Sequence, residues 1–478
     1  MKPITSKTDQ NSIPLIWAFI LPALYWIYLF FSTTMDIKFD AAGYQQYGET
    51  IYRHGYLEYL KIAPEKVPLY SIIISFSMWI ADHLHVSYQT IQKIIQIGFL
   101  SSAQFFTMKI LQSLKLHQTI IFALTLYFGF SPALVNSAFS LFPEIPTYVF
   151  TLGILWACIQ SWELIQSKDI PKLLLWAFIF SALFVPLTLL RPVFEYVLIV
   201  LLFCFFCLAL PLLFQKRFRS FINTIIFITI AFCVFQASVY PLRMLNFKHN
   251  GYKSLTVVGN QSLYATALGR VRPLNTTNVL TFLSFVPGQN ICERIFKPEE
   301  CGFWSKENNI SGKNKTLELR ALGMSNSEID NELKNLAITT VLSRPIQYSL
   351  LTFAEGFKLI FWESTEVGFV NYPQWLTNIF VNPIAKFGTR LMISLITFIS
   401  LIMMIKLLWQ ERKAIYQLSD IDHKKISVIL FSLILIVITI ALYAPFRTAI
   451  RYAFSIVPLY FILIGLALQK IFNKPGNQ

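Results

Sequence analysis

The chain has 478 residues, of which 55% are hydrophobic and only 14% are charged. Soluble globular domains carry about 25% charged residues, so this composition excludes an ordinary soluble protein and indicates a multi-pass membrane protein. The net charge of +15 gathers at the ends of the apolar runs, where membrane topology explains it, and we expect no binding to nucleic acid.

The apolar runs predict an all-α protein with about 10 or 11 transmembrane helices. A hydrocarbon core of about 30 Å takes roughly 20 helical residues. The runs that reach or approach this length are 13–31, 91–111, 118–135, 143–162, 173–190, 193–214, 221–242, 391–409, 426–443 and 449–468. The first run lacks a small-residue cleavage site, so we expect a membrane helix there and not a cleaved signal peptide.

Basic residues predict the orientation, because loops rich in Lys and Arg stay in the cytoplasm. The residues concerned are Lys2, Lys7, Lys109, Lys115, Lys168, Lys172, Lys216, Arg217, Arg219, Arg412, Lys413, Lys424, Lys425, Lys470 and Lys474. They share one side only if the short run 67–81 does not cross the bilayer, so we interpret that run as a half-membrane or interfacial helix. The segments around residues 40, 144, 191 and 451 then face the outer side.

The segment "KFDAAGYQQYGETIYRHGYLEYL" (38–60) has the pattern of an acidic, tyrosine-rich helix. At helical spacing Asp40, Tyr44, Tyr47 and Ile51 share one face. A carboxylate at a membrane surface could accept the proton of a hydroxyl that attacks a lipid-borne donor. The alternative is a solvated loop with an aromatic belt at the interface.

Charged residues near the other outer helix ends are further candidates. Glu144 in "SLFPEIPTYVF" heads a helix, where the helix dipole also explains a carboxylate. Arg191 in "LTLLRPVFEY" lies between two membrane helices, which makes it a functional-site hypothesis or a snorkelling turn residue. Arg447 and Arg451 in "APFRTAIRYAF" lie one turn apart and suit a phosphate. The alternative for this pair is a structural ion pair with a carboxylate of the first loop.

The break in hydrophobicity divides the chain into three parts: 1–244 as an N-terminal transmembrane region with an outer loop at 34–66, 245–345 as an extracytoplasmic insert, and 346–478 as an interfacial helix with the C-terminal membrane helices. We expect the insert to be a small α or α/β domain. Within it, "MSNSEIDNELKNLAITTVLSRP" predicts a helix capped by Ser325 or Asn326. Cys292 and Cys301 are expected to form a disulfide, because the outer compartment permits one.

These pieces together resemble the GT-C superfamily of integral-membrane glycosyltransferases, the group of protein O-mannosyltransferases and aminoarabinose lipid A transferases. Asp40, Tyr44 and Gly55 followed by "KVPLYSIII" resemble the family's opening "Asp-x-x-x-Tyr … Gly … Pro-Pro-Leu-Tyr-Pro". "FPEIPTYVFTLGILWA", "LLRP" and "RYAFSIVPLYFILIGLAL" are similar to its later motifs, in the same order. Ala41 stands where the family has a second acidic residue, and Asp36 could substitute for it, so the base is either Asp36 or Asp40.

The resemblance implies a GT-C-like fold and an inverting glycosyltransferase. This enzyme would move a monosaccharide from a polyprenyl-phosphate carrier to a hydroxyl of a glycan, lipid or protein. The implied catalytic residues are Asp40, Asp36 and Glu144, and the implied substrate-binding residues are Tyr44, Arg191, Arg447 and Arg451. Some members of the wider superfamily use a divalent cation, but no clear ligand cluster calls for a metal in this sequence.

We expect a bacterial inner (plasma) membrane, with the active site on its outer face and membrane lipid around the helices. The Asn-x-Ser/Thr patterns that begin at Asn260, Asn275, Asn309 and Asn314 would instead suit an ER lumen. Two alternative functions stay open. One is a transporter or flippase for a lipid-linked glycan, or a polymerase of such glycans. The other is a non-catalytic scaffold, in which Asp40 and Arg451 would lie far apart with no cavity between them.

Overall fold

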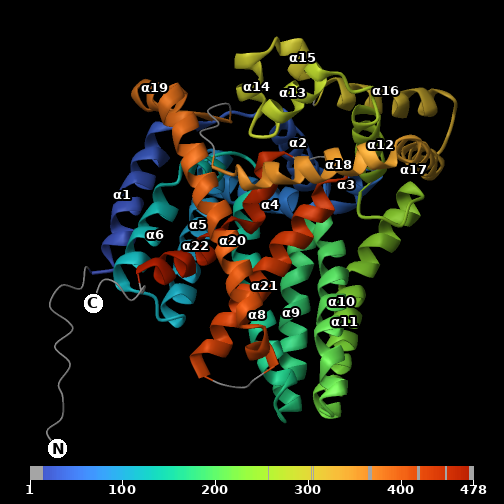
Figure 1. Ribbon diagram of the computed structural model, residues 1–478. Coiled ribbons are helices and arrows are strands. Elements are labelled where there is room, and N and C mark those ends of the chain that lie inside the picture. Colours follow the sequence, from blue (N-terminus) through green and yellow to red (C-terminus); the bar gives the residue numbers. More distant parts are fainter. Residues whose placement is uncertain are drawn as a thin grey trace, which may run out of the picture.

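The computed structural model describes residues 14–256, 258–302, 304, 306–363, 369–416, 420–446 and 449–472. These residues are almost entirely helical (Figure 1). Across the described ranges the only strands are β1 (Thr34–Met35) and β2 (Val370–Asn371), which pair antiparallel with Thr34 opposite Asn371. This pair ties the first segment after α1 to the stretch before the C-terminal membrane helices.

Eight helices of the described chain are long and apolar enough to cross a membrane. They are α5 (Tyr88–Ser113), α8 (Glu144–Ile165), α9 (Ile170–Leu190), α10 (Val193–Phe214), α11 (Phe218–Asn250), α20 (Thr389–Gln410) with the π-helical turn η3 (Ile384–Gly388), α21 (Asp420–Tyr443), and α22 (Val457–Phe472) with the 3-10 turn η5 (Ile450–Ile456). The protein is therefore an integral multi-pass membrane protein.

The expected number of about 10 or 11 membrane helices is too high. The run 118–135 breaks into α6 (Gln118–Phe130) and α7 (Pro132–Ala138), bent by 47°, and counting this pair as one span makes nine. Ser131 and Pro132 cause the break, because the Ser131 side chain caps a new helix that starts at the proline. α1 (Trp17–Ser32) has 16 residues, which reach only about 24 Å at 1.5 Å per residue.

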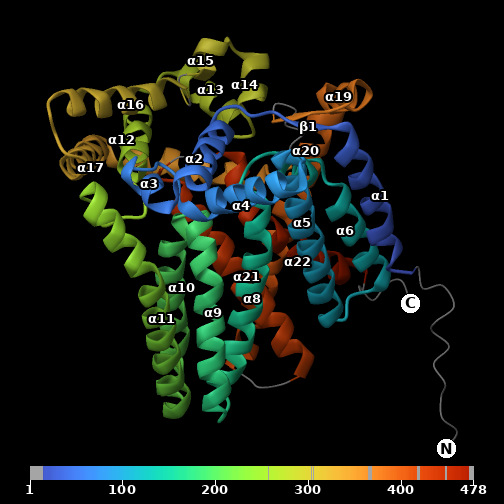
Figure 2. The same ribbon diagram turned by 180° about the vertical axis from the view of Figure 1, so that it is seen from behind.

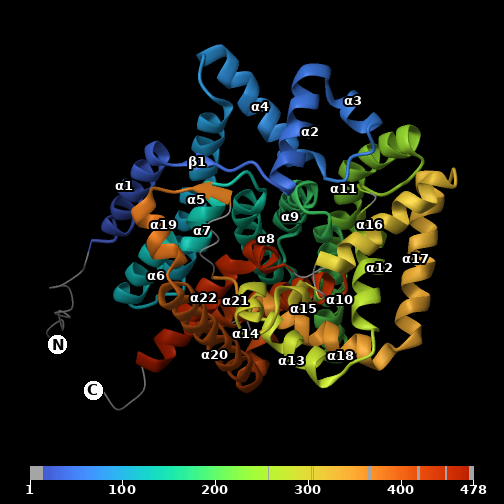
Figure 3. The same cartoon turned by 90° about the horizontal axis from the view of Figure 1, so that it is seen from above.

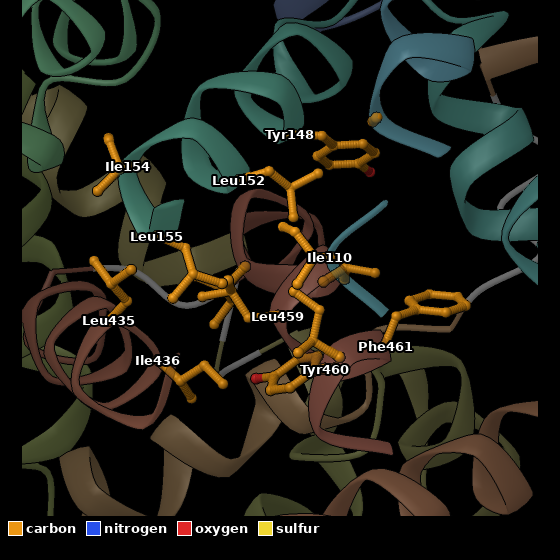
Figure 4. Packing of buried hydrophobic residues seen from close by; sticks show 14 of the residues in the cluster. Ile110, Tyr148, Leu152, Ile154, Leu155, Leu435, Ile436, Leu459, Tyr460 and Phe461 are labelled. Carbon is orange, nitrogen blue, oxygen red and sulfur yellow. The ribbon is translucent and has the colours of Figure 1, made fainter. Parts of the chain in front are cut away.

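The interior is built around α22, the most enclosed of the candidate spans, while α11 is the least enclosed. Figure 4 shows side chains of α5, α8, α21 and α22 meeting there. Its labelled residues are Ile110, Tyr148, Leu152, Ile154, Leu155, Leu435, Ile436, Leu459, Tyr460 and Phe461. Gly465 permits this close packing, because a Cβ at that position would lie about 3.0 Å from Leu111 and Leu124 side-chain atoms.

The basic turns meet at one end of the molecule. Arg217, before α11, donates a hydrogen bond to the carbonyl of Tyr416 at 2.8 Å. Arg219 donates to the carbonyl of Lys168, between α8 and α9, at 3.3 Å. The basic turns near residues 168, 217 and 412 thus share one end, as the sequence predicts, while Lys2, Lys7 and Lys474 lie outside the described residues.

The opposite end carries the first loop as three helices, α2 (Asp40–His54), α3 (Tyr56–Lys61) and α4 (Pro68–Leu84). Gly55, with φ 86°, makes the turn between α2 and α3. α4 is not among the candidate spans, and it lies across the ends of the long helices (Figures 2 and 3). Both the helix predicted in 38–60 and the interfacial position of 67–81 agree with this arrangement.

The insert is helical, and it is not a clearly separate domain. Its helices are α12 (Val258–Arg270), α13 (Thr276–Phe285), α14 (Gln289–Ile295), α15 (Pro298–Gly302), α16 (Lys306–Ala321) and α17 (Asn326–Ser343). They are followed by α18 (Pro345–Gly356), η1 (Phe357–Ile360) and α19 (Gln374–Val381), and η4 (Arg412–Tyr416) lies between α20 and α21. The expected separate domain is wrong because α11 runs unbroken to Asn250 and polar contacts join the insert to the membrane helices.

Arg270 is the main such contact. Its side chain is buried, and it binds the Glu355 carboxylate of α18 at 2.5 Å and the Ala444 carbonyl after α21 at 2.7 Å. A buried cation is stable only where acceptors surround it. This arginine therefore fixes α12 against both α18 and α21.

Local predictions for the insert are confirmed. Ser325 caps α17, and its partner Glu328 completes a capping box. Cys292 and Cys301 form a disulfide. α18 lies across the ends of the membrane helices (Figure 1), in agreement with the predicted interfacial helix.

Replacing Arg270 tests this join between the insert and the membrane helices. Arg270→Met leaves the largely buried Glu355 carboxylate without its cation, which costs up to about 3–5 kcal/mol. We expect a clear drop in the melting temperature of the protein purified in lipid nanodiscs. Arg320→Met removes an exposed arginine of α16 and is expected to melt like wild type. Equal melting temperatures for both variants would contradict the role given to Arg270.

Candidate functional site

A cavity of about 400 Å³ lies at the end of the molecule remote from the basic turns. Its lining combines α2, the turn between α9 and α10, the start of the insert, and the segment between α21 and α22. The predicted residues Asp40, Tyr44, Arg191 and Arg451 all line it. Asp40 and Arg451 are 411 positions apart in the chain and are in direct contact. The arrangement expected for a scaffold, with these two residues far apart and no shared cavity, is therefore not observed.

Asp40 is held by two cations. It is the first residue of α2, where the helix dipole favours a negative charge. Its Oδ1 accepts a hydrogen bond from Lys66 Nζ at 2.9 Å, and its Oδ2 accepts one from the Arg451 guanidinium. Both carboxylate oxygens therefore have a cationic partner.

These partners also set the charge of Asp40. Its partial burial alone would raise the pKa, but the Arg451 and Lys66 cations outweigh that effect and hold the pKa of Asp40 well below its ordinary value. The carboxylate is ionised at neutral pH. The ion pair with a first-loop carboxylate, left open as the alternative for Arg451, is thus present.

Arg191 forms the next part of the lining. It follows the last residue of α9 and pairs with Glu144, the first residue of α8. Its guanidinium also lies over the Tyr452 ring, 5.2 Å from the centroid. Glu144 is buried and is not part of the cavity wall, so it reaches the site only through Arg191.

Tyrosines surround the cations. The Tyr44 ring is buried against Tyr70, with 5.1 Å between the centroids. Burial raises the pKa of Tyr44, so its phenol stays protonated and can donate a hydrogen bond. Tyr443 stacks on Tyr452 at 4.9 Å, and its buried hydroxyl, on a residue that lines the cavity, has no hydrogen-bond partner among the described residues.

The structure separates the two candidates for the base. Asp36 lies just after β1 and pairs with Lys38 at 2.6 Å. It does not line the cavity, whereas Asp40 does. Arg447 lies outside the described residues. Of the predicted ionisable residues, Asp40, Arg191 and Arg451 therefore come together, with Glu144 behind Arg191.

The sequence analysis did not select several residues of the lining. These are Lys66, Glu65, Asn260 and Asp330. Lys66 directly precedes the "VPLY" stretch, so its place could have been noticed from that motif. Asn260 and Asp330 belong to insert helices whose position depends on tertiary packing, and their local pattern carries no such signal.

Metal binding has no support from the described side chains. Within these residues no three His, Cys, Asp or Glu side chains gather as metal ligands would. The cations that face the Asp40 carboxylate come from the chain itself. We define Lys66, Arg191 and Arg451 as the cation cluster.

The sequence was also compared with known proteins. No protein-family model matches the chain, and no curated protein matches it significantly. What these residues do must therefore be argued from their own geometry and chemistry.

Proposed function

We propose that the protein is an inverting glycosyltransferase of the GT-C type, which moves a monosaccharide from a polyprenyl-phosphate carrier to a hydroxyl acceptor. The observation that carries this proposal is the convergence of Asp40 and the cation cluster on one cavity. A carboxylate paired with two cations, with a third cation in the same lining, offers both a proton acceptor and a binding site for a phosphate leaving group.

The position of the cavity favours a lipid-borne donor. Arg191 directly follows α9, and Arg451 lies at the start of the candidate span 450–472. The phosphate of a donor whose lipid tail lies among the helices would thus be at the level of the cation cluster. The cavity lies at the end opposite the basic turns, so the positive-inside rule favours the outer face.

The location also favours transfer over transport. Transporter sites lie near the bilayer midplane, often between broken helices. This cavity lies at the ends of α9, α10 and α21 instead. A polyprenyl-phosphate sugar bound there presents its sugar to the outer aqueous side, where a hydroxyl acceptor can reach it.

In the proposed reaction, the acceptor oxygen forms a bond to the anomeric carbon while the bond from that carbon to the phosphate oxygen breaks. The electron pair of the broken bond leaves with the lipid phosphate, and the acceptor proton passes to the Asp40 carboxylate. Attack from the face opposite the phosphate inverts the configuration. The cation cluster stabilises the charge that grows on the phosphate.

Donor binding would activate the base. In the structure, Lys66 and Arg451 occupy both oxygens of Asp40 and hold its pKa low, which makes it a weak proton acceptor. A phosphate competes for the same cations and draws them from the carboxylate. The pKa of Asp40 then rises, and the acceptor proton can be taken only when a donor is present.

Replacing the two candidate bases tests the proposal. Asp40→Asn removes the proton acceptor that lines the cavity, and we expect sugar transfer to fall by roughly two to four orders of magnitude, the contribution of a general base. Asp36→Asn is the matched control and should retain activity. The measurement is transfer from radiolabelled polyprenyl-phosphate sugars in membranes with matched expression. Full activity of Asp40→Asn, or no donor turnover by wild type, would overturn the proposed function.

The pH dependence of transfer tests the link between Lys66 and Asp40. The base must be ionised, so activity is lost as the pH falls through the pKa of Asp40. Lys66→Met removes one cation, which raises this pKa and shifts the acid limb of the kcat/KM profile to higher pH. It also weakens donor binding, and we expect the donor KM to rise roughly tenfold for one lost charged hydrogen bond.

Lys61→Met is the control for this measurement. Lys61 is exposed on α3 and pairs with Glu58, away from the cavity lining. Its profile should match wild type. An acid limb that stays in place in Lys66→Met would show that Lys66 does not set the pKa of the catalytic base.

A further inference from the structure

We propose that the part of the cavity wall formed by α12 and α17 binds a hydroxyl-rich acceptor, the ring of a sugar, through Asp330 and Asn260. The inference rests on the proposed function for the reaction that follows binding. It assigns the acceptor to one chemical class. The proposed reaction alone requires only that the acceptor carry a hydroxyl group.

The polar residues of this wall come from three neighbouring segments. Ser254 and Thr256 lie in the loop after α11, Asn260 and Ser262 lie on α12, and Asp330 lies on α17. The Asn246 amide donates to the Ser254 carbonyl at 2.6 Å and holds the loop. α12 packs along α17, so the two helices present their polar side chains to one space.

Asp330 differs in its partners from two other carboxylates of the cavity lining, Asp40 and Glu195. Asp40 binds the cations Lys66 and Arg451, and Glu195 binds Arg243. Among the residues that the structure describes, Asp330 makes no ion pair and is held by the side-chain amide of Asn260. Its partial burial raises its pKa, against the opposing effects of that hydrogen bond and of the more distant Lys334 cation. A half-buried carboxylate that makes no ion pair retains hydrogen-bonding capacity for a ligand.

The chemistry of the wall fits hydroxyl groups. A hydroxyl both donates and accepts hydrogen bonds, and the wall offers a carboxylate, an amide and the hydroxyls of Ser262 and Thr256. An ammonium ligand would need acceptors only. A phosphate would be repelled by Asp330 and attracted to the cation cluster instead.

The remaining lining fits the ring of a sugar. Tyr196 and Phe446 add aromatic faces next to this polar wall, and such faces pack against the apolar surface of a ring. A volume of about 400 Å³ lies within the range of small-ligand sites. It is sufficient for a sugar beside the phosphate-linked sugar of the donor.

The first test measures direct binding of methyl glycosides to the purified protein in nanodiscs by saturation-transfer NMR. A panel of methyl glucoside, galactoside and mannoside, each with its monodeoxy analogues, serves as probe. We expect wild type to bind at least one parent glycoside better than a deoxy analogue. Asp330→Asn should weaken binding of that glycoside roughly tenfold or more, the effect of one hydrogen bond to a charged group, and should lose the preference over the deoxy analogue.

Two further variants make the result specific. Glu332→Gln makes the same charge change two positions along α17, at a residue outside the lining, and should bind like wild type. Ser262→Ala is a milder change in the wall and should weaken binding less than Asp330→Asn. Loss of binding in Glu332→Gln as well, or equal binding by wild type and Asp330→Asn, would overturn the inference.

Kinetics then distinguish this inference from the proposed function. With a polyprenyl-phosphate sugar as donor and the bound glycoside as acceptor, Asp330→Asn should raise the acceptor KM with no matching rise in the donor KM. Glycoside binding without any donor turnover would contradict the proposed function but would still support this subsite. Donor turnover with an acceptor KM that is unchanged in Asp330→Asn would contradict the subsite and leave the proposed function supported.

Discussion

The charge arrangement around Asp40 is the constraint on which the rest of the site depends. A carboxylate and the cations Lys66 and Arg451 lie together at the end of a bundle of apolar helices, where unpaired charges are costly. Each group is stable there because the others are present. The cluster joins the first loop to the last membrane helix, and it forms the end of the cavity at which an anionic ligand would be held.

The surrounding helices keep these charges in place. Arg191 is fixed by Glu144 at the head of α8, and Arg451 precedes α22, the most enclosed helix of the bundle. Arg270 holds the insert against α18 and α21, which places α12 and α17 beside the same cavity. A rigid apolar interior thus positions side chains from five distant parts of the chain, while the exchange of partners around Asp40 needs only side-chain movement.

Much of the fold could be predicted from local patterns. The apolar runs, the Ser325 cap and the cysteine pair each depend on neighbouring residues. The cap and the disulfide are confirmed, and most of the apolar runs form helices long enough to cross a membrane. The break between α6 and α7 was missed because its hydropathy is continuous, although Ser131 and Pro132 mark it. For the site, conspicuous charges led to Asp40 and Arg451. Lys66 was missed although it directly precedes the "VPLY" stretch, whereas Asp330 reaches the cavity only through tertiary packing. Because that packing joins residues hundreds of positions apart, no local pattern could indicate Asp330.

The central claim is that a lipid phosphate takes the place of Asp40 as partner of Lys66 and Arg451, with Arg191 as a further contact. A cryo-EM structure of the protein in nanodiscs with bound polyprenyl phosphate tests it most directly. We predict phosphate oxygens in contact with Arg451 and Arg191, and an Asp40 carboxylate that has lost at least one of its two cations. A phosphate bound elsewhere, with the contacts from Asp40 to Lys66 and Arg451 intact, would contradict the claim.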